Sequence, residues 1–264
     1  MAVFDAFTYN GEREVLKIHL NILDKYVDTF IICEAKTTFS GIKKPLYFFR
    51  DQRWFRKWWH KIEYYVIDEN YSPDELLLAQ TSPNTQGATH WKREFLQKEA
   101  IKKALSHAKL QDDDLCLIGD VDEIIDPTAT YESDKPFKAR LRVYAYYLNN
   151  ESDEQFWGTL VAQYKDIKNN CLNHMRSDTK LYSKGDPLGW HFTSMGGEEE
   201  VRRKLNDSYT KESYNTDEVQ QNLKDRFSQR KDYLGRPFNF KALEEHLPPF
   251  LKENKAKYKH LWLP

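Results

Sequence analysis

Cysteine is scarce in this chain, with three among 264 residues. Cys33, Cys116 and Cys171 are odd in number and lie far apart in the sequence. This spacing argues against a disulfide framework and against a thiolate metal site, because both need cysteines that can approach one another. Two of the three lie in apolar runs. We therefore expect them to be small core residues in a reducing compartment.

Long hydrophobic runs and an excess of one charge are also missing. No segment approaches the ~20 apolar residues of a membrane-spanning helix, and the first residues lack the basic and apolar parts of a signal peptide. Forty lysine and arginine residues stand against 41 aspartate and glutamate residues, so no overall positive field attracts nucleic acid or anionic membranes. We expect a soluble, cytoplasmic protein without a membrane span.

Strand-like and helix-like segments alternate along the first half of the chain. Strands are predicted by the apolar and β-branched runs at residues 27–35, 62–67 and 115–118. Helices are predicted by apolar residues at helical spacing within residues 10–25 and 91–108. This alternation predicts an α/β, Rossmann-like fold with a mixed, mostly parallel central sheet flanked by helices.

The pattern changes after residue 126. Aromatic runs at residues 137–148, 156–164 and 181–192 predict further strands, which a mixed sheet accommodates. Asn10 and Thr216 are the expected N-caps of the first and the last long helix, and the last helix should stop at a Gly-Arg-Pro signal. The length allows one large domain, and no internal repeat or low-complexity linker divides it. We expect a single domain.

The most informative segment joins an apolar strand to a group of carboxylates. The strand at residues 115–118 is followed by Asp120, Asp122 and Glu123, and open α/β sheets bind ligands at the carboxyl ends of their strands. Closely spaced carboxylates suit a hard divalent cation such as Mg²⁺ or Mn²⁺. We expect Asp120 and Asp122 to bind a metal. Residues 112–114 are better explained as a solvated turn of acidic residues.

Several short segments, spread over nearly the whole chain, share their order and spacing with a known family. They lie at residues 4–12, 27–35, 39–41, 44–48, 91–97, 119–124, 189–192 and 247–251. Each is weak by itself, but together they resemble the signature of glycosyltransferase family 17.

The resemblance implies a fold and a reaction. The implied fold is GT-A-like, with a donor-binding half at about residues 1–126 and an acceptor-side, C-terminal part at about residues 127–264. The implied reaction moves a sugar, with inversion, from a UDP-linked nucleotide-sugar donor to a hydroxyl acceptor, a glycan first of all. The family includes an N-acetylglucosaminyltransferase that acts on N-glycans. Without that enzyme's membrane anchor, this chain resembles a soluble microbial or viral member, in the latter case working in the host cytoplasm.

The resemblance also implies a metal site. Asp120, Asp122 and His191 are the expected ligands of Mn²⁺ or Mg²⁺, and Asp120 is also placed to meet the donor ribose. His191 follows a glycine and a tryptophan at the end of a predicted strand. A lone histidine can equally be a hydrogen-bonded core residue, and both interpretations of His191 stay open.

Other residues are candidates for donor binding. Arg93, Gln97 and Lys98 share a helix that precedes the metal strand, where side chains one turn apart face the same way. We expect one or more of them to face the donor phosphates. Glu34 ends an early strand and is expected either to contact the nucleotide or to cap a helix.

Inversion in one displacement needs a general base near the acceptor hydroxyl, and a carboxylate is the usual choice. Glu154 and Glu198 are the preferred candidates. Glu123, beside the metal motif, is the third. Surface carboxylates are common, so each of these three can also be inert.

Two further segments have a functional and a structural interpretation. Residues 53–60 interleave cations with aromatic rings, which suits stacking on sugars or nucleic-acid bases, although packing of the tryptophans on the sheet explains them better. Gly196 and Gly197 either let the backbone approach a diphosphate or form a turn.

Three rival functions stay open. One is a glycosyltransferase acting on modified nucleic-acid bases, in which nucleic acid is the acceptor. Another is a Mg²⁺-dependent phosphatase of the haloacid dehalogenase type, whose nucleophile strand also ends in Asp-x-Asp, but that strand normally opens the fold. The last is a sugar-nucleotide-binding module without catalysis.

Overall fold

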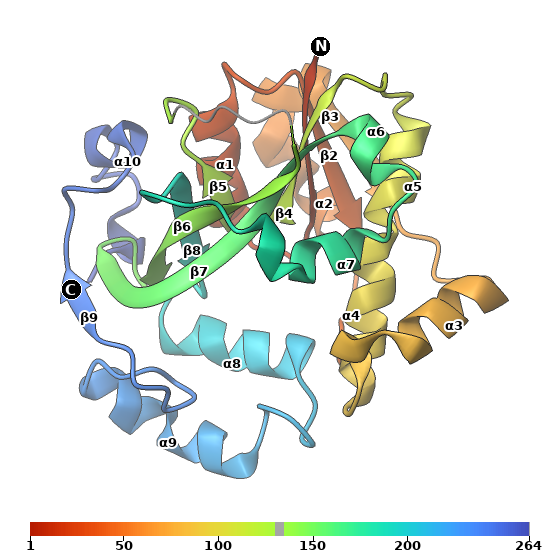
Figure 1. Cartoon of the computed structure of the whole chain (residues 1–264). Helices are drawn as coiled ribbons and strands as arrows, with labels where there is room; N and C mark the ends of the chain where they lie inside the picture. The colour runs from red at the N-terminus through yellow and green to blue at the C-terminus, as the bar shows by residue number, and fades with distance from the viewer. Residues whose placement is uncertain (130–134, 264) are drawn as a thin grey trace.

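A mixed sheet of nine strands forms the centre of the described part of the chain, residues 1–129 and 135–263. This computed structural model orders the strands β3-β2-β1-β4-β7-β6-β8-β5, and β9 pairs with β7 (Figure 1). The strands are β1 (Val3–Thr8), β2 (Thr29–Glu34), β3 (Ile62–Val66), β4 (Leu115–Asp120), β5 (Glu123–Ile125), β6 (Phe137–Ala145), β7 (Asn150–Gln163), β8 (Gly189–Thr193) and β9 (Phe240–Ala242).

Helices surround this sheet, and α8 crosses below it in Figure 1. The α-helices are α1 (Arg13–Leu23), α2 (Tyr47–Asp51), α3 (Pro73–Thr81), α4 (Thr89–Glu99), α5 (Ile101–His107), α6 (Tyr164–Ile167), α7 (Leu172–Ser177), α8 (Glu198–Ser208), α9 (Asp217–Ser228) and α10 (Pro249–Glu253). The 3₁₀ helices are η1 (Gln52–Lys61), η2 (Pro83–Thr85), η3 (Thr179–Leu181) and η4 (Lys259–Leu261). Within the described residues, none of these helices combines the length and apolarity needed to cross a bilayer.

Parallel and antiparallel pairings occupy different parts of the sheet. The strands β3, β2, β1 and β4 are parallel neighbours, as the alternation of strands and helices predicts. β7 is antiparallel to β4, β6 and β9, whereas β6 and β8 are parallel. The α/β, Rossmann-like mixed sheet is therefore confirmed, and its parallel pairings are concentrated in the first half of the chain.

The two faces of the sheet are covered by different helices. Along β2, Phe30 and Ile32 pack into the hydrophobic cluster that contains α1, while Ile31 and Cys33 pack into the cluster that contains α5. This alternation follows from the two-residue period of a strand, which sends successive side chains to opposite faces. Cys33 and Cys116 are fully buried free thiols, so their expected place in the core is confirmed.

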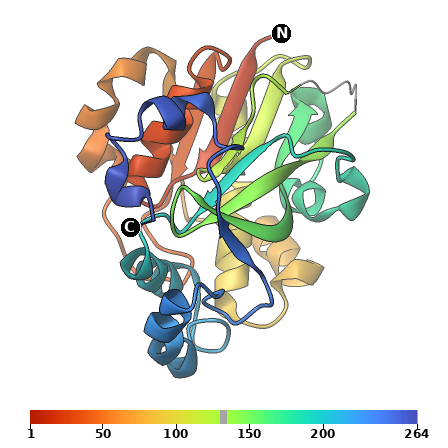
Figure 2. The same cartoon turned by 90° about the vertical axis from the view of Figure 1, so that its left-hand side faces the viewer.

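The C-terminal segment completes the first of these clusters. Tyr258, Leu261 and Trp262 are buried there together with residues of α1. Figure 2 shows the segment, in blue, lying against α1. The indole N–H of Trp190 in β8 donates to the carbonyl of His246 at 2.6 Å. The end of the chain is thus part of the same core as its beginning.

Three details of the predicted elements are wrong. The N-cap of α1 is Glu12 rather than Asn10, and the Asn10 side chain instead donates to Asp207 on α8. Of the strand predicted at residues 181–192, only the end is found, as β8, because the earlier residues contain the short helix η3 and a turn. Thr216 does cap α9, by accepting from the Val219 N–H, but the helix ends at Ser228, before the predicted stop.

Residues 53–60 lie within η1 and divide between core and surface. Phe55 and Trp58 are buried in the core, as packing against the sheet requires. Trp54 and Trp59 remain 47% and 50% exposed. Packing is therefore confirmed for two of these four rings, and stacking of the exposed pair on a sugar or a base stays a prediction.

Glu34 is a fully buried hydrogen-bond acceptor at the end of β2. Its carboxylate accepts from the N–H groups of Tyr47 and Phe48 at 2.6 and 3.0 Å, in the first turn of α2. It also accepts from Lys44 Nζ at 3.0 Å and from the Tyr64 hydroxyl at 2.9 Å. The helix-capping interpretation of Glu34 is confirmed, and the carboxylate links β2, β3 and α2.

Replacing Glu34 with glutamine should destabilise the fold strongly, because the Lys44 ammonium is left buried without its counter-charge. Removing one partner of a buried ion pair costs about 3–5 kcal/mol. Glu63→Gln on the neighbouring strand β3, where the side chain is exposed, is the matched control and should change stability by less than about 0.5 kcal/mol. Urea denaturation measures both, and equal losses would contradict the role given to Glu34.

Candidate functional site

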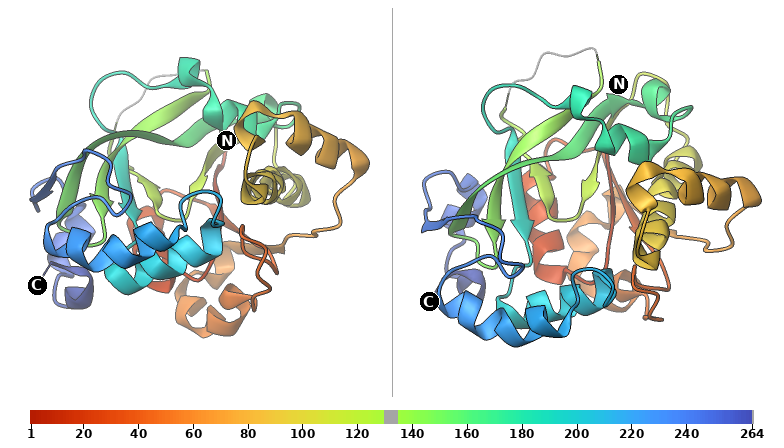
Figure 3. Two further views of the ribbon diagram at one scale, coloured as in Figure 1. Left: turned by 90° about the horizontal axis from the view of Figure 1, so that it is seen from below. Right: turned by 60° about the horizontal axis from the view of Figure 1, so that its bottom comes forward.

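Cavity 1, of about 470 Å³, opens at the carboxyl ends of the parallel strands β1, β2 and β4. Thr8, Ala35 and Asp120 line it from these strand ends, and Arg203 and Lys204 line it from α8. Seen from below in Figure 3, α8 and α9 lie side by side across this end of the molecule. The topology therefore places the cavity where open α/β sheets bind ligands.

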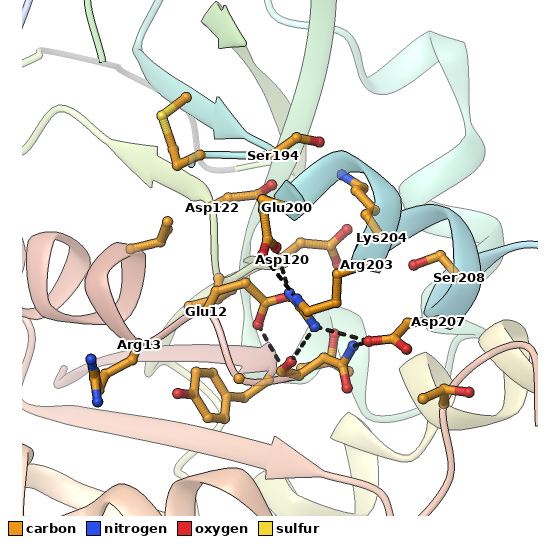
Figure 4. A pocket seen from close by; sticks show the side chains of 18 of the residues that line it. Glu12, Arg13, Asp120, Asp122, Ser194, Glu200, Arg203, Lys204, Asp207 and Ser208 are labelled. Atoms are coloured by element: carbon orange, nitrogen blue, oxygen red, sulfur yellow. Dashed lines mark hydrogen bonds and ion pairs between the residues drawn. The ribbon is translucent and has the colours of Figure 1, made fainter. Parts of the chain in front are cut away.

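Charged side chains dominate cavity 1. Among its described lining residues, seven carboxylates stand against five lysine or arginine side chains. Arg203 lies at the centre of the acids and donates to Glu200 and Asp207, both at 2.9 Å, as Figure 4 shows. Burial raises the pKa of Glu12, whose carboxylate lies 3.5 Å from Arg203. The excess of acid gives this cavity a place for an added cation.

Asp122, which lines cavity 1, forms a largely buried pair with His191 on β8, whose ring stacks on Phe156. Asp122 Oδ2 lies 3.4 Å from His191 Nε2. Burial acts to raise the pKa of Asp122, but His191 and Lys204 outweigh it and hold the pKa below its ordinary value. Burial acts to lower the pKa of His191, and Asp122 raises it above its ordinary value. The two groups thus stabilise each other's charged forms.

Asp120 is held between two cations. Lys98 Nζ donates to Asp120 Oδ2 at 3.1 Å, and the Arg176 guanidinium donates to Oδ1 at 3.2 Å. Burial acts to raise the pKa of Asp120, but Lys98 and Arg176 outweigh it and keep the pKa well below its ordinary value. Both carboxylate oxygens are therefore engaged, which fixes the direction of this side chain.

Cavity 2, of about 380 Å³, lies on the other side of the turn after β4 that carries Asp120, Asp122 and Glu123, hereafter the acidic turn. Glu123 lines cavity 2, Asp122 lines cavity 1, and Asp120 lines both. Asp122 lies in the turn between β4 and β5, and Glu123 is the first residue of β5, so the two carboxylates face different cavities. Among the described lining residues, Asp120 is the one that the cavities share.

Two glycines make room for the Glu123 carboxylate. A Cβ atom at Gly119 would lie 2.8 Å from Glu123 Oε2, and one at Gly158 would lie 2.8 Å from the same oxygen. The carboxylate is also 3.4 Å from Arg176 and accepts from the Thr159 hydroxyl at 3.3 Å. Burial raises the pKa of Glu123 above its ordinary value. Any larger side chain at either glycine would displace this group.

His19 supports the acidic turn through a contact with the Val121 carbonyl, and no sequence pattern predicted this role. Its Nε2 pairs with Asp5 Oδ2 at 2.5 Å, and its Nδ1 contacts the Val121 carbonyl at 2.8 Å. Burial acts to lower the pKa of His19, but Asp5 and the Val121 carbonyl raise it above its ordinary value. A protonated His19 donates to both partners and thereby ties α1, β1 and the turn together.

The three predicted donor-binding residues on α4 lie in different places relative to the two cavities. Gln97 lines cavity 1 and donates to the Thr37 carbonyl at 3.1 Å. Lys98 lines cavity 2 and reaches cavity 1 only through Asp120. Arg93 lines neither cavity and donates to the Phe39 carbonyl, so its guanidinium supports a loop.

The two preferred general-base candidates lie outside both cavities. Glu154 pairs with Arg236 at 3.3 Å, and Glu198 pairs with Arg202 at 2.7 Å on the first turn of α8. Glu123 is therefore the one of the three predicted carboxylates that lines a cavity. The glycine pair before α8 forms a turn in which the N–H groups of Gly196 and Gly197 donate to the Tyr146 carbonyl.

The structure brings Asp122 and His191 together and leaves Asp120 paired with cations. No group of three or more histidine, cysteine, aspartate or glutamate side chains within the described residues has the arrangement of a metal site. A carboxylate and an imidazole are nevertheless ordinary ligands of Mn²⁺. The pair fits a cation that takes its remaining ligands from a bound substrate, as Mg²⁺ commonly does.

A comparison with known families supports the resemblance seen in the sequence. The model of glycosyltransferase family 17 matches residues 1–211, from before β1 to just beyond α8. The match therefore includes the acidic turn, His191 and most of both cavities. No curated protein matches the chain.

His19→Gln should cost about 1–3 kcal/mol of stability, because buried hydrogen-bond partners lose a charged donor. It should also remove a pH dependence. Since the folded pKa is raised above the usual 6.5, protonated His19 stabilises the fold fully below about pH 6.5, and this contribution is lost as the pH rises through the folded pKa.

Urea denaturation at several pH values, for the wild-type protein and for His19→Gln, measures this difference. His60→Gln is the control, because His60 is exposed on η1. The stability difference between wild type and His19→Gln should shrink with rising pH. His60→Gln should have the stability of wild type at every pH. A difference that does not change with pH would show that His19 is neutral in the folded protein.

Proposed function

The chain belongs to glycosyltransferase family 17, and on that premise we propose that it is a metal-dependent, inverting enzyme with a UDP-linked sugar donor and a glycan acceptor. The observation that carries the proposal is the acidic turn between the two cavities. Sugar transfer requires two reactants to be held at one point in a reactive geometry. The turn is the point at which the two cavities meet.

Cavity 1 suits the nucleotide-sugar donor by its place and its size. It lies at the carboxyl ends of parallel strands, where α/β folds bind nucleotides. Its volume of about 470 Å³ falls in the usual range for small-molecule sites. Gln97 is the predicted donor contact that lines it.

Charge supports a role for Mn²⁺ or Mg²⁺. A nucleotide sugar carries a diphosphate, yet cavity 1 holds more carboxylates than cationic side chains. Asp122 and His191 are the residues that would hold the cation, and diphosphate oxygens would complete its coordination. When bound, the cation would offset the negative charge that develops on the departing diphosphate.

Lys204 adds a permanent positive charge beside this pair. Its Nζ donates to the Thr193 hydroxyl at 2.9 Å, which fixes its position on α8. Burial acts to lower the pKa of Lys204, but Asp122 and other neighbours raise it above its ordinary value. The ammonium therefore stays charged and can stabilise the leaving nucleoside diphosphate.

The proposed reaction is a single displacement. The acceptor hydroxyl oxygen forms a bond to the anomeric carbon while the bond from that carbon to the phosphate oxygen breaks. The nucleoside diphosphate leaves with the electron pair, and attack from the opposite side inverts the anomeric carbon. The hydroxyl proton passes to a carboxylate, for which Glu123 is the candidate because it lines cavity 2.

Asp122→Asn should abolish metal-dependent binding of the donor. For wild type we expect UDP-N-acetylglucosamine, or another UDP-sugar of a panel, to raise the melting temperature when Mn²⁺ is present, because a ligand of the native state stabilises it. Asp113→Asn is the control, since Asp113 is exposed at the opposite end of β4. A wild-type protein that responds to no nucleotide sugar would contradict the proposal, and an unchanged response in Asp122→Asn would remove Asp122 from the site.

Lys204→Gln should lower kcat by about 10²–10³-fold, the usual effect of removing one group that stabilises charge in a transition state. The donor KM should change much less. Lys211→Gln is the control, because its side chain is 78% exposed in a surface ion pair. Steady-state release of UDP measures both variants, and an unchanged kcat in Lys204→Gln would exclude this role.

A further inference from the structure

Cavity 2 lies outside the site proposed for the donor, and we propose that it is the acceptor site and binds an uncharged oligosaccharide. This assignment rests on the proposed function, because an acceptor site has meaning only beside a donor site. Its position is the first support. Asp120 lines both cavities, so a hydroxyl group presented from cavity 2 arrives at the place where cavity 1 ends. Glu123, the candidate base, lies on the cavity 2 side.

Aromatic rings form one wall of cavity 2. Trp157, Phe156 and Trp91 line it. Tyr182 stacks behind Trp157 with ring centroids 4.5 Å apart and ring planes 4° apart. The ring of a sugar presents an apolar C–H face to such a surface while its hydroxyl groups point outward. A flat aromatic surface with nearby polar groups is therefore suited to a saccharide.

The wall is rigid before any ligand arrives. The indole N–H of Trp157 donates to the Ser183 carbonyl at 3.0 Å, which fixes the tilt of the ring. On the opposite side, the Asn173 side chain donates to the Phe95 carbonyl at 3.0 Å and to Glu99 at 2.9 Å. Side chains held in this way lose little freedom when a ligand binds, which favours affinity.

The charges of cavity 2 balance, which distinguishes a neutral saccharide from nucleic acid. Three carboxylates and three cationic side chains line it among the described residues. Lys98 pairs with Glu94 and Asp120, and Arg176 pairs with Asp120 and Glu123. Binding of a nucleic-acid phosphate backbone needs unpaired positive charge. Because Lys98 and Arg176 are already paired, cavity 2 offers little unpaired positive charge.

Lys138 is the remaining cation of cavity 2. Its Nζ lies 4.9 Å from the centroid of the Tyr182 ring, and burial lowers its pKa to about 8. The positive charge of the cavity therefore decreases further in mildly alkaline solution. A polyanion therefore gains little affinity from the charge of this cavity, whereas the affinity for an uncharged acceptor does not depend on that charge.

The test measures saccharide binding without any donor, by saturation-transfer difference NMR on the full chain. The probes are N,N′-diacetylchitobiose, mannobiose and lactose, with a short oligothymidylate as the nucleic-acid probe. Wild type should bind at least one disaccharide, and Trp157→Ala should bind it about tenfold more weakly or worse. Trp157→Phe, which keeps an aromatic face, should retain most of the binding.

Phe49→Ala is the control, because Phe49 is an aromatic residue that is 63% exposed on α2 and lines neither cavity. It should leave saccharide binding unchanged. The rise in melting temperature with UDP-sugar and Mn²⁺, measured on every variant, reports that each variant is folded with its donor site intact.

Four outcomes would overturn the assignment. These are undiminished saccharide binding in Trp157→Ala, a parallel loss in Phe49→Ala, binding of oligothymidylate in place of the disaccharides, and no binding of any probe by wild type. If one of these occurs while the donor response of wild type persists, the acceptor assignment fails and the proposed function stands. If wild type shows no donor response, the proposed function itself fails.

Discussion

The contact between His19 and the Val121 carbonyl is the constraint on which the site depends. With Asp5 on its other nitrogen, the imidazole ties the turn after β4 to the first strand and the first helix. A turn fixed at Val121 sends Asp122 toward one cavity and Glu123 toward the other. The turn is thus supported by a buried group that lines neither cavity.

Around that turn, each acid has at least one cationic partner. Asp120 has Lys98 and Arg176, Asp122 has His191 and Lys204, and Glu123 shares Arg176. Buried carboxylates without such partners would take up protons. The network keeps Asp120 and Asp122 ionised while burial holds the pKa of Glu123 high, so neighbouring acids of one motif have different protonation behaviour.

The sequence predicted the parallel part of the sheet and the place of the acidic turn, because each depends on local pattern or on strand ends meeting at one edge. It connected Asp122 with His191 only through the family resemblance, as ligands of one metal ion, and that role stays a prediction. It did not predict His19 or Lys204, whose contacts with Val121 and Asp122 join residues far apart along the chain. Glu34 shows the same limit, since its helix-capping role needed the position of α2. Cavity 2 was not predicted because its lining residues come from α4, β7 and α7, which are far apart in the sequence and form no linear motif.

The C-terminal segment has a consequence for the site. The family match ends at residue 211, yet His260 and Leu261 line cavity 1 and Trp262 lies in the main core. The acidic turn therefore lies inside the matched region, whereas part of the lining of cavity 1 lies outside it. A substitution in the last residues can alter the shape of cavity 1 without any change in the acidic turn itself.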